Sequence, residues 1–450
     1  MHYIFTQIAS YRDPQLIPTL DSLLDNADKP EQIHVGICWQ HGPEEGLELF
    51  LDAGFDFSGF NDATLRTGSH PCIDATYKGA KFTIIDVPYL ESQGACWARN
   101  AIQQLYSGEK YTLQLDSHHR FVPGWDTKCV DMLESLRYKS PKPVLTAYIP
   151  SFDPENDPAG RTQQAWKMDF DRFIPEGAVF FMPSNIEDSS ERTEPMRARF
   201  YSAHFCFADG SFATEVQHDP EYFFHGEEIS IAARAFTHGY DLYHPHQIVA
   251  WHEYTRKNRT KVWDDHTTSK KHETGLKLDW VERNDMCHKR NRILFGMDGE
   301  DPTQIDFGKY GFGTERTLRQ YEEYAGISFQ YRAVQQFTLD KNEPVYPGKS
   351  FDSEEQWRDS MTGSHDICIC VHRNDLGELV DDFDFFYVAA HDAEGEIFRK
   401  DMQVADIKQH LANEWIDYRF IFLANRAPTG YTIWTHSASR GWMTKIDRTL

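Results

Sequence analysis

The order of apolar segments in the first 150 residues is the feature that most constrains the fold. Strand-like apolar segments occur at residues 3–8, 33–39, 82–87, 111–115 and 144–149. Helical patterns at 16–24 and 92–105 fall between them, and the leucines of the first recur at the spacing of one helix face. Strands that alternate with helices in this way are typical of an α/β domain with a mostly parallel sheet. The sequence therefore predicts this fold class.

The pattern changes after about residue 335. Five strand-like segments divided by turn residues lie at 367–372, 383–390, 396–399, 418–423 and 430–436, with one short helical pattern at 404–415. Regularly spaced short strands favour an antiparallel β domain. A chain of 450 residues also exceeds the usual size of one domain. We therefore expect a large domain over residues 1–330 and a smaller β domain over residues 335–450.

The composition excludes some classes of partner and location. The chain carries 46 basic and 70 acidic residues, a formal net charge of −24, which opposes binding to a nucleic-acid backbone. The eight cysteines form no CxxC pair, so we expect reduced thiols rather than a zinc ribbon. We find no signal-peptide pattern and no apolar run of transmembrane length. The default expectation is a cytoplasmic protein with no nucleic-acid partner.

A polar triplet, Asp116-Ser117-His118, ends the strand-like segment at 111–115. A carboxylate and an imidazole two residues apart, at the end of a strand, can bind one metal ion, although Asp-Ser is also ordinary turn chemistry. His119 is an alternative ligand. Ligands of α/β sheets lie beyond the carboxyl ends of the strands, and Ser10-Tyr-Arg-Asp13 follows the first strand in the same way. We expect both segments at one rim of the sheet.

Several motifs occur together in a fixed order. They are Ile4-Phe-Thr-Gln-Ile-Ala-Ser-Tyr-Arg-Asp13, Gly94-Ala-Cys-Trp-Ala-Arg-Asn100, Leu113-Gln-Leu-Asp-Ser-His-His-Arg-Phe121 and Asp219-Pro-Glu-Tyr-Phe-Phe-His-Gly-Glu-Glu-Ile229. This set, over residues 2–325, resembles the family of the cytoplasmic Skp1-type hydroxyproline GlcNAc-transferases. These are GT-A glycosyltransferases with an Asp-x-His motif, related to the polypeptide GalNAc-transferases. The C-terminal β domain lies outside the resemblance.

The resemblance implies a nucleotide-sugar donor, UDP-GlcNAc, a hydroxyl acceptor on a protein, and transfer with retention of the anomeric configuration. It also implies a divalent cation, Mn²⁺ or Mg²⁺, held by Asp116, His118 and His252. Mixed oxygen and nitrogen ligands suit Mn²⁺ better than Mg²⁺. Such a cation would neutralise the charge that grows on the UDP leaving group.

The resemblance also assigns residues to the donor and to its sugar. The residues implied for the nucleotide-sugar are Ser10, Arg12, Asp13, Arg99, Asn100, Asp116 and Gly210. For Arg12 an ion pair at the surface is an equal alternative, and Asn100 could instead cap its helix. The catalytic candidates near the sugar are Asp209, Glu227 and Glu228. An acidic residue in the first turn of a helix also simply favours the helix dipole, which is the alternative for the two glutamates.

The sequence does not identify a carboxylate nucleophile, which a double displacement would need. The resemblance implies front-face attack instead, in which the departing phosphate takes the acceptor proton. A glycosyl-enzyme trapped on Glu227 or Asp209 would overturn this expectation. Alternative functions are a glycan-elongating transferase of polysaccharide synthesis and a non-catalytic carbohydrate-binding protein. A metallohydrolase lacks support, because the sequence contains no HExxH motif.

Overall fold

The computed structural model describes residues 3–65, 68–257 and 259–450, which form two compact units. The first unit comprises the described residues of Met1–Asp171, Glu176–Gly326 and Lys341–Ser350. The second comprises Arg172–Pro175, Ile327–Asp340 and Phe351–Leu450. Within the described residues, no helix combines the length and the apolar character needed to cross a bilayer.

A ten-stranded sheet organises the described part of the first unit, in the order β11-β13-β8-β12-β6-β1-β2-β5-β4-β3. The four neighbouring strands β6, β1, β2 and β5 are parallel, and so are β13 and β8. The other neighbours pair antiparallel. The bounds are β1 (Ile4–Tyr11), β2 (Ile33–His41), β3 (Asp56–Leu65), β4 (Gly68–Tyr77), β5 (Ala80–Pro88), β6 (Tyr111–Asp116), β8 (Pro143–Thr146), β11 (Met196–Arg197), β12 (Phe205–Asp209) and β13 (Asp241–His244). The predicted α/β fold is confirmed, and the β3–β4 hairpin is an addition that the sequence pattern did not reveal.

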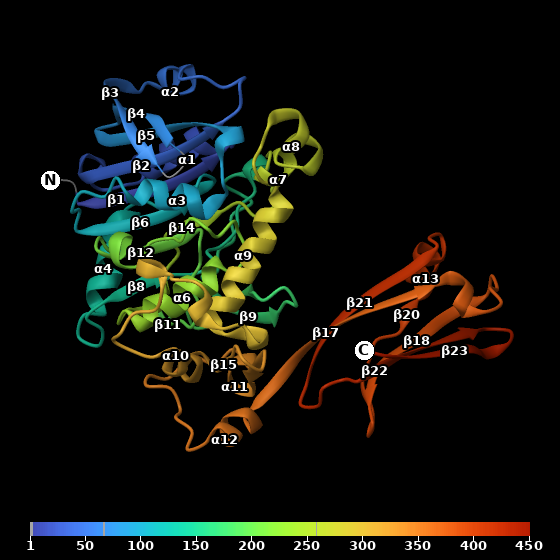
Figure 1. Cartoon of the computed structure of the whole chain (residues 1–450). Coiled ribbons are helices and arrows are strands. Elements are labelled where there is room, and N and C mark those ends of the chain that lie inside the picture. Colours follow the sequence, from blue (N-terminus) through green and yellow to red (C-terminus); the bar gives the residue numbers. More distant parts are fainter. Residues whose placement is uncertain (1–2, 66–67, 258) are drawn as a thin grey trace. The chain divides into compact units, whose positions relative to one another are not determined.

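Helices cover both faces of this sheet (Figure 1). Apolar side chains of α1 (Leu16–Asp25) and α4 (Trp125–Ser135) pack with one set of strand residues, including Ile4 and Ile8. Side chains of α3 (Ala95–Gln103) pack with Phe5, which points to the opposite face because side chains alternate along a strand. The remaining helices are α2 (Glu48–Ala53), α5 (Phe212–Glu215), α6 (Glu227–Thr237), α7 (Val262–Asp265), α8 (Thr268–Thr274), α9 (Trp280–Phe295) and α10 (Leu318–Ala325).

The chain also forms two small sheets of two strands each, separate from the large one. The strands β7 (His119–Phe121) and β14 (Ala250–His252) pair antiparallel, with His252 opposite His119. The strands β9 (Trp166–Phe173) and β10 (Val179–Asn185) form the other pair. The first of these pairs decides which residues meet at the rim of the large sheet.

The second unit is built from antiparallel strands, as predicted from the C-terminal pattern. One sheet has the order β15-β16-β17-β21, and the other has β19-β18-β22-β23, with β20 beside β18. An apolar cluster that includes Ile369, Phe386 and Ile433 forms its core. The elements are β15 (Ile327–Ser328), β16 (Ala333–Gln335), α11 (Gln336–Leu339), α12 (Glu354–Asp359), β17 (Met361–His372), β18 (Phe383–Asp392), β19 (Gly395–Arg399), β20 (Met402–Gln403), α13 (Val404–Leu411), β21 (Trp415–Ala424), β22 (Gly430–Ser437) and β23 (Gly441–Thr449).

Candidate functional site

The parallel pairing of β1 with β6 brings two polar segments to one rim of the sheet. The register sets Ala9 opposite Asp116, so β6 ends two residues before the level at which β1 ends. Asp13 follows β1, and Ser117 and His118 follow β6. The carboxyl ends of parallel strands are where α/β sheets bind their ligands.

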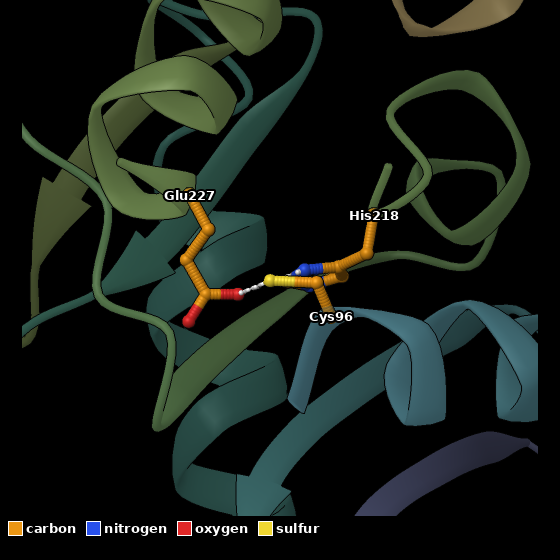
Figure 2. A group of neighbouring side chains, drawn as sticks. All are labelled: Cys96, His218 and Glu227. Atoms are coloured by element: carbon orange, nitrogen blue, oxygen red, sulfur yellow. Dashed lines mark hydrogen bonds and ion pairs between the residues drawn. The ribbon is translucent and has the colours of Figure 1, made fainter. Parts of the chain in front are cut away.

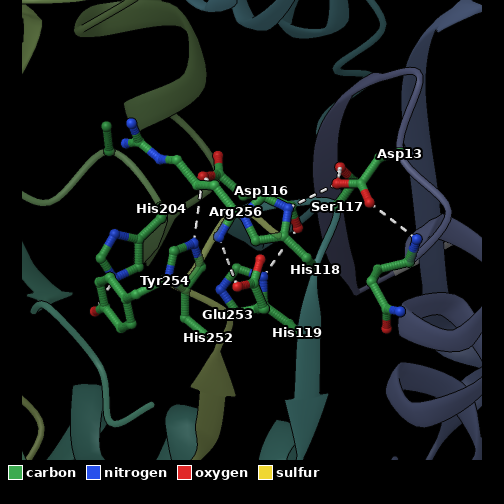
Figure 3. A network of polar contacts seen from close by, with 12 residues as sticks. Asp13, Asp116, Ser117, His118, His119, His204, His252, Glu253, Tyr254 and Arg256 are labelled. Atoms are coloured by element: carbon green, nitrogen blue, oxygen red, sulfur yellow. Dashed lines mark hydrogen bonds and ion pairs between the residues drawn. The ribbon is translucent and has the colours of Figure 1, made fainter. Parts of the chain in front are cut away.

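Asp116, His118 and His252 converge at this rim, and their donor atoms all lie within 4.8 Å of one another. The Nε2 atoms of His118 and His252 lie 3.7 and 3.5 Å from Oδ2 of Asp116. His252 reaches this place because β14 pairs with β7, directly after the Asp-Ser-His turn. Figure 3 shows the three side chains pointing toward one another. One carboxylate and two imidazoles in this arrangement form a possible ligand set for a cation.

Asp13 fixes the orientation of the His118 ring. Nδ1–H of His118 donates to Oδ2 of Asp13 (2.7 Å), and the Ser117 hydroxyl donates to the same oxygen (2.6 Å). Burial raises the pKa of Asp13, but hydrogen bonds from His118 and Ser117 and the charge of Arg259 outweigh burial and lower it. The Nε2 lone pair of His118 therefore faces the convergence point. A guanidinium nitrogen of Arg259 lies 2.6 Å from this Nε2 and contacts Nδ1 of the same ring as well.

His252 is buried and neutral, because burial lowers its pKa well below the usual value. Neither ring nitrogen of His252 makes a hydrogen bond to the residues that the structure describes. The ring of His204 stacks on it at 4.2 Å between centroids, and Tyr254 lies edge-on at 4.3 Å. His119 instead donates from Nδ1 to the carbonyl of Asp116 (2.9 Å), so one of its two nitrogens is already engaged.

Arg99 joins Asp116 to Glu227. Its guanidinium donates from Nη2 to Oδ1 of Asp116 (2.6 Å) and from Nη1 to Oε1 of Glu227 (2.7 Å). Burial raises the pKa of both carboxylates, but the charge of Arg99 outweighs it, and the pKa of Glu227 falls to about 2. Both carboxylates are therefore ionised, and the buried cation holds them in place.

Two cavities meet at this cluster, and Arg99, Asp116, Phe224, His252 and Arg256 line both. The smaller cavity, of about 140 Å³, lies at the ends of β1 and β6 and at the start of α3. The larger cavity has a volume of about 310 Å³. Its further lining is mostly aromatic or acidic, and includes Tyr148, Phe180, Phe181, His204, Glu228 and Tyr254.

Glu228 is held on the wall of the larger cavity. Its carboxylate accepts hydrogen bonds from the hydroxyl of Tyr148 (2.7 Å) and the backbone N–H of Ala203 (2.9 Å). Burial raises the pKa of Glu228 to about 7, against the lowering effect of these two bonds. This carboxyl group can therefore both accept and donate a hydrogen bond near neutral pH.

The structure corrects the placement of Asp209 and Gly210. The strand β12 runs antiparallel to β6, so Phe205 lies opposite Leu115 and Asp209 lies opposite Tyr111, at the far end of the strand. Asp209 pairs there with Arg137 (2.8 Å). A Cβ on Gly210 would meet the carbonyl of Glu109 at 2.0 Å, which explains the glycine without a sugar.

Three more residues were predicted to bind the donor, namely Ser10, Arg12 and Asn100. None of them is among the described residues that line the two cavities. Ser10 is buried on β1, between the cavity-lining Ala9 and Tyr11, and alternation turns its side chain away. Arg12 forms an ion pair with Asp265 (2.8 Å). Asn100 donates to the carbonyl of His218 (2.8 Å). The ion-pair alternative for Arg12 is therefore the one that the structure supports.

The sequence patterns missed part of the cavity lining. Tyr148 ends a predicted strand at the same edge as Asp116, and Arg256 follows His252 by four residues, so their positions were weak signals. Nothing in the local pattern singled out other lining residues such as His204, Phe180, Phe181 and Tyr254.

A model of the family described as Glycosyltransferase (GlcNAc) matches residues 3–331, which include every residue of this site. The chain belongs to this family. A comparison with curated proteins gave no match. Among solved structures, the chain is similar to GalNAc-T7 with UDP, GalNAc and Mn²⁺, at 14% identity and a TM-score of 0.40, over 71% of this chain and 54% of that one.

Two structures of S. aureus TarS are also similar to this member of the GlcNAc family. TarS 1–349 in complex with UDP-GlcNAc matches at 9% identity and a TM-score of 0.33, over 65% of this chain and 73% of that one. A structure of S. aureus TarS matches at 11% identity and a TM-score of 0.35, over 100% of this chain and 85% of that one. The match to GalNAc-T7 spans about half the length of that chain.

Proposed function

We propose that this glycosyltransferase moves GlcNAc from UDP-GlcNAc to a hydroxyl group on a protein, with retention of configuration and with Mn²⁺ bound by Asp116, His118 and His252. One observation carries the proposal. The three donor groups converge where two cavities meet, which is where a diphosphate between a nucleoside and a sugar would have to lie.

The residues present fit a manganese ion. One carboxylate and two imidazoles are a mixed set that Mn²⁺ accepts more readily than Mg²⁺ does. The nitrogens of His252 lack hydrogen bonds within the described structure, and Asp13 directs Nε2 of His118 to the same point. Arg259 contacts that nitrogen as well, so its guanidinium must turn aside, where it can meet a phosphate. When bound, the ion would supply charge neutralisation for the UDP leaving group.

The two cavities suit the two halves of the donor. The smaller one lies at the end of parallel strands and at the start of α3, a place that favours a nucleotide. The larger one offers aromatic faces and the carboxyl group of Glu228, which suit the faces and hydroxyls of a sugar. Arg256 lines both cavities and can contact the diphosphate between them.

Front-face attack remains the proposed route to retention. Both oxygens of Glu227 are already engaged, one by Arg99 and one by the thiol of Cys96, so Glu227 is a poor nucleophile. Asp209 lies at the other end of β12. The task of the chain would be to orient the donor and exclude water, while the leaving phosphate accepts the proton of the acceptor hydroxyl.

Sugar release from UDP-GlcNAc, with and without Mn²⁺, tests the proposal. We expect Mn²⁺-dependent release of UDP, and its loss in Asp116→Ala. The matched control is Asp209→Ala, the same change at the opposite end of the sheet, which should keep the activity. If Asp116→Ala releases UDP at the parental rate, the metal assignment is wrong. A thermal-shift panel of UDP-sugars with Mn²⁺ would identify the donor, since a bound ligand stabilises the fold.

A further inference from the structure

Three potential metal ligands from separate elements meet next to Arg99, which pairs with one of them. They are Cys96 in the first turn of α3, His218 after α5, and Glu227 at the start of α6. Their donor atoms lie within 4.8 Å of one another, with Sγ of Cys96 2.7 Å and Nδ1 of His218 3.4 Å from Oε2 of Glu227. The three residues are at most 5% exposed. Figure 2 shows the thiol and the imidazole directed at one carboxylate oxygen.

The hydrogen bonds of Gln114 fix the tautomer of His218. The side-chain amide of Gln114 donates to the carbonyl of Ala203 (2.5 Å), so its oxygen faces His218. Nε2 of His218 lies 2.5 Å from this oxygen and must be the protonated nitrogen. Nδ1 then carries a lone pair, and it makes no hydrogen bond within the described structure.

This lone pair faces a charged oxygen among buried side chains. Glu227 is ionised because Arg99 pairs with it, so Oε2 also presents lone pairs. The thiol of Cys96 donates its one proton to Oε2 of Glu227, which leaves the lone pair of Nδ1 without a donor in the described structure. A cation between the three groups would satisfy all of them.

We propose that Cys96, His218 and Glu227 bind one Zn²⁺. Thiolate, imidazole and carboxylate are zinc ligands, and a soft thiolate selects Zn²⁺ over Mn²⁺. A histidine ligand usually donates its other N–H to an oxygen, as His218 does to Gln114. On binding, the S–H bond of Cys96 is replaced by an S–Zn bond, and the proton leaves to solvent.

This zinc site shares no ligand with Asp116, His118 and His252, and the proposal does not depend on the donor. Arg99 is the link between the two clusters, because it pairs with both Glu227 and Asp116. One thiolate and one carboxylate would balance the charge of zinc. The charge of Arg99 would then be balanced by Asp116.

Metal analysis of the full-length chain tests the proposal. The protein is loaded with Zn²⁺, dialysed against a weak chelator, and measured by inductively coupled plasma mass spectrometry. Because Asp116, His118 and His252 can also take Zn²⁺, the measurement is made on the His252→Ala chain. We expect one zinc per chain there, and a loss of at least tenfold when Cys96→Ser is added. The matched control is Cys129→Ser, an equally buried thiol on α4, which should retain zinc. Retention of zinc when Cys96→Ser is added, or its absence from the loaded His252→Ala chain, overturns the proposal.

A cobalt titration needs no variant at the site and so does not depend on how Cys96→Ser folds. Cys368 and Cys370 are exposed, so both are first replaced by serine. We expect one equivalent of Co²⁺ to produce a thiolate-to-metal absorption band that Zn²⁺ abolishes. Without that band, and with His218 doubly protonated by nitrogen NMR, the cluster is an ion pair and the zinc assignment fails. His252→Ala should keep the band, which separates this outcome from failure of the manganese proposal.

Discussion

Asp13 controls the manganese site without contacting it in the proposed arrangement. Its carboxylate accepts from Nδ1–H of His118 (2.7 Å), which leaves Nε2 to face Asp116. Outer carboxylates of this kind raise the basicity of the histidine and set its ring orientation. The side chain that follows β1 therefore positions a proposed ligand that follows β6.

Replacing Asp13 by asparagine should weaken Mn²⁺ binding by about 10-fold to 100-fold. The amide of asparagine carries no charge to polarise the His118 ring. Its NH₂ group also cannot accept the hydrogen bonds that Oδ2 of Asp13 accepts from Ser117 and His118. Paramagnetic resonance of free Mn²⁺ during a titration measures the affinity. Asp209→Asn, with its carboxylate at the other end of the sheet, is the control and should bind like the parent. Equal affinities for Asp13→Asn and the parent would remove Asp13 from the site.

Glu109 makes a different kind of contribution, because it stabilises the fold away from the cavities. Its carboxylate accepts from Nδ1–H of His34 on β2 (2.7 Å) and from the backbone N–H of Ser107 (2.9 Å). Burial raises the pKa of Glu109, but these hydrogen bonds outweigh it and lower the pKa to about 2. The folded pKa lies below the unfolded one, so the contribution is complete above about pH 5 and is lost as the pH falls toward 2.

Glu109→Gln should therefore lower stability at pH 7 and have little effect near pH 2. A shift of this size corresponds to about 3 kcal/mol, and solvent screening reduces the expected loss to about 1–2 kcal/mol. Thermal unfolding of parent and variant between pH 2 and pH 7 measures the difference. The two melting curves should converge as the solution becomes more acidic. A constant gap over the whole range would mean that the charge of Glu109 does not contribute.

At the scale of elements, the sequence predicted where the strands of the parallel core lie, but not how every strand pairs with its neighbours. The apolar segments that became β1, β2, β5, β6 and β8 are visible because buried strands are continuous apolar runs. The direction of β12 is not visible in its own residues, since it depends on pairing with β6 and β8. The resemblance implied a role for Asp209 near the sugar, and this pairing places Asp209 at the other end of the strand from Asp116.

At the rim of the site, too, local residues were visible in the sequence and long-range pairing was not. Asp116 and His118 could be proposed from their place at the end of a strand, without the resemblance. His252 could not, because only the pairing of β14 with β7 brings it near them. The four-residue segment after it then places Tyr254 and Arg256 on the cavity walls. Long-range pairing therefore decided the part of the site that local patterns missed.

The first turn of α3 depends on Gly94. Its φ of +106° favours glycine, and a Cβ there would meet the carbonyl oxygen and the ring of Phe223, both at 2.6 Å. Gly94 also lines the smaller cavity. Relief of this clash has to move Phe223 or the start of the helix that carries Cys96 and Arg99.

Gly94→Ala should destabilise the first unit and weaken donor binding. Gly108 gives a matched control, because its φ is +101° but a Cβ there meets nothing within 4 Å. Both alanines bear the backbone cost of on the order of 1–3 kcal/mol, and only Gly94→Ala adds the clash. Chemical unfolding and UDP titration of the two variants measure the two effects. If the variants lose equal stability and bind UDP equally well, the close approach to Phe223 has no role.

At the scale of the whole molecule, the two units have separate apolar cores. The cluster of the ten-stranded sheet and the cluster around Phe386 and Ile433 share no residue. The predicted site residues all belong to the first unit. A ligand of the site should therefore stabilise one core directly, and a change in the other core should leave ligand binding intact.

Calorimetry of the full chain should resolve two unfolding transitions, of which UDP with Mn²⁺ raises only one. A ligand at about 100 times its Kd stabilises the unit that binds it by about 2.7 kcal/mol. Ile433→Ala identifies the other transition, because it opens a cavity in the second core, where Ile433 is 1% exposed. That change should cost about 2–5 kcal/mol and move only the transition that does not respond to the ligand. A single transition that moves with both UDP and Ile433→Ala would show instead that the two cores unfold as one cooperative unit.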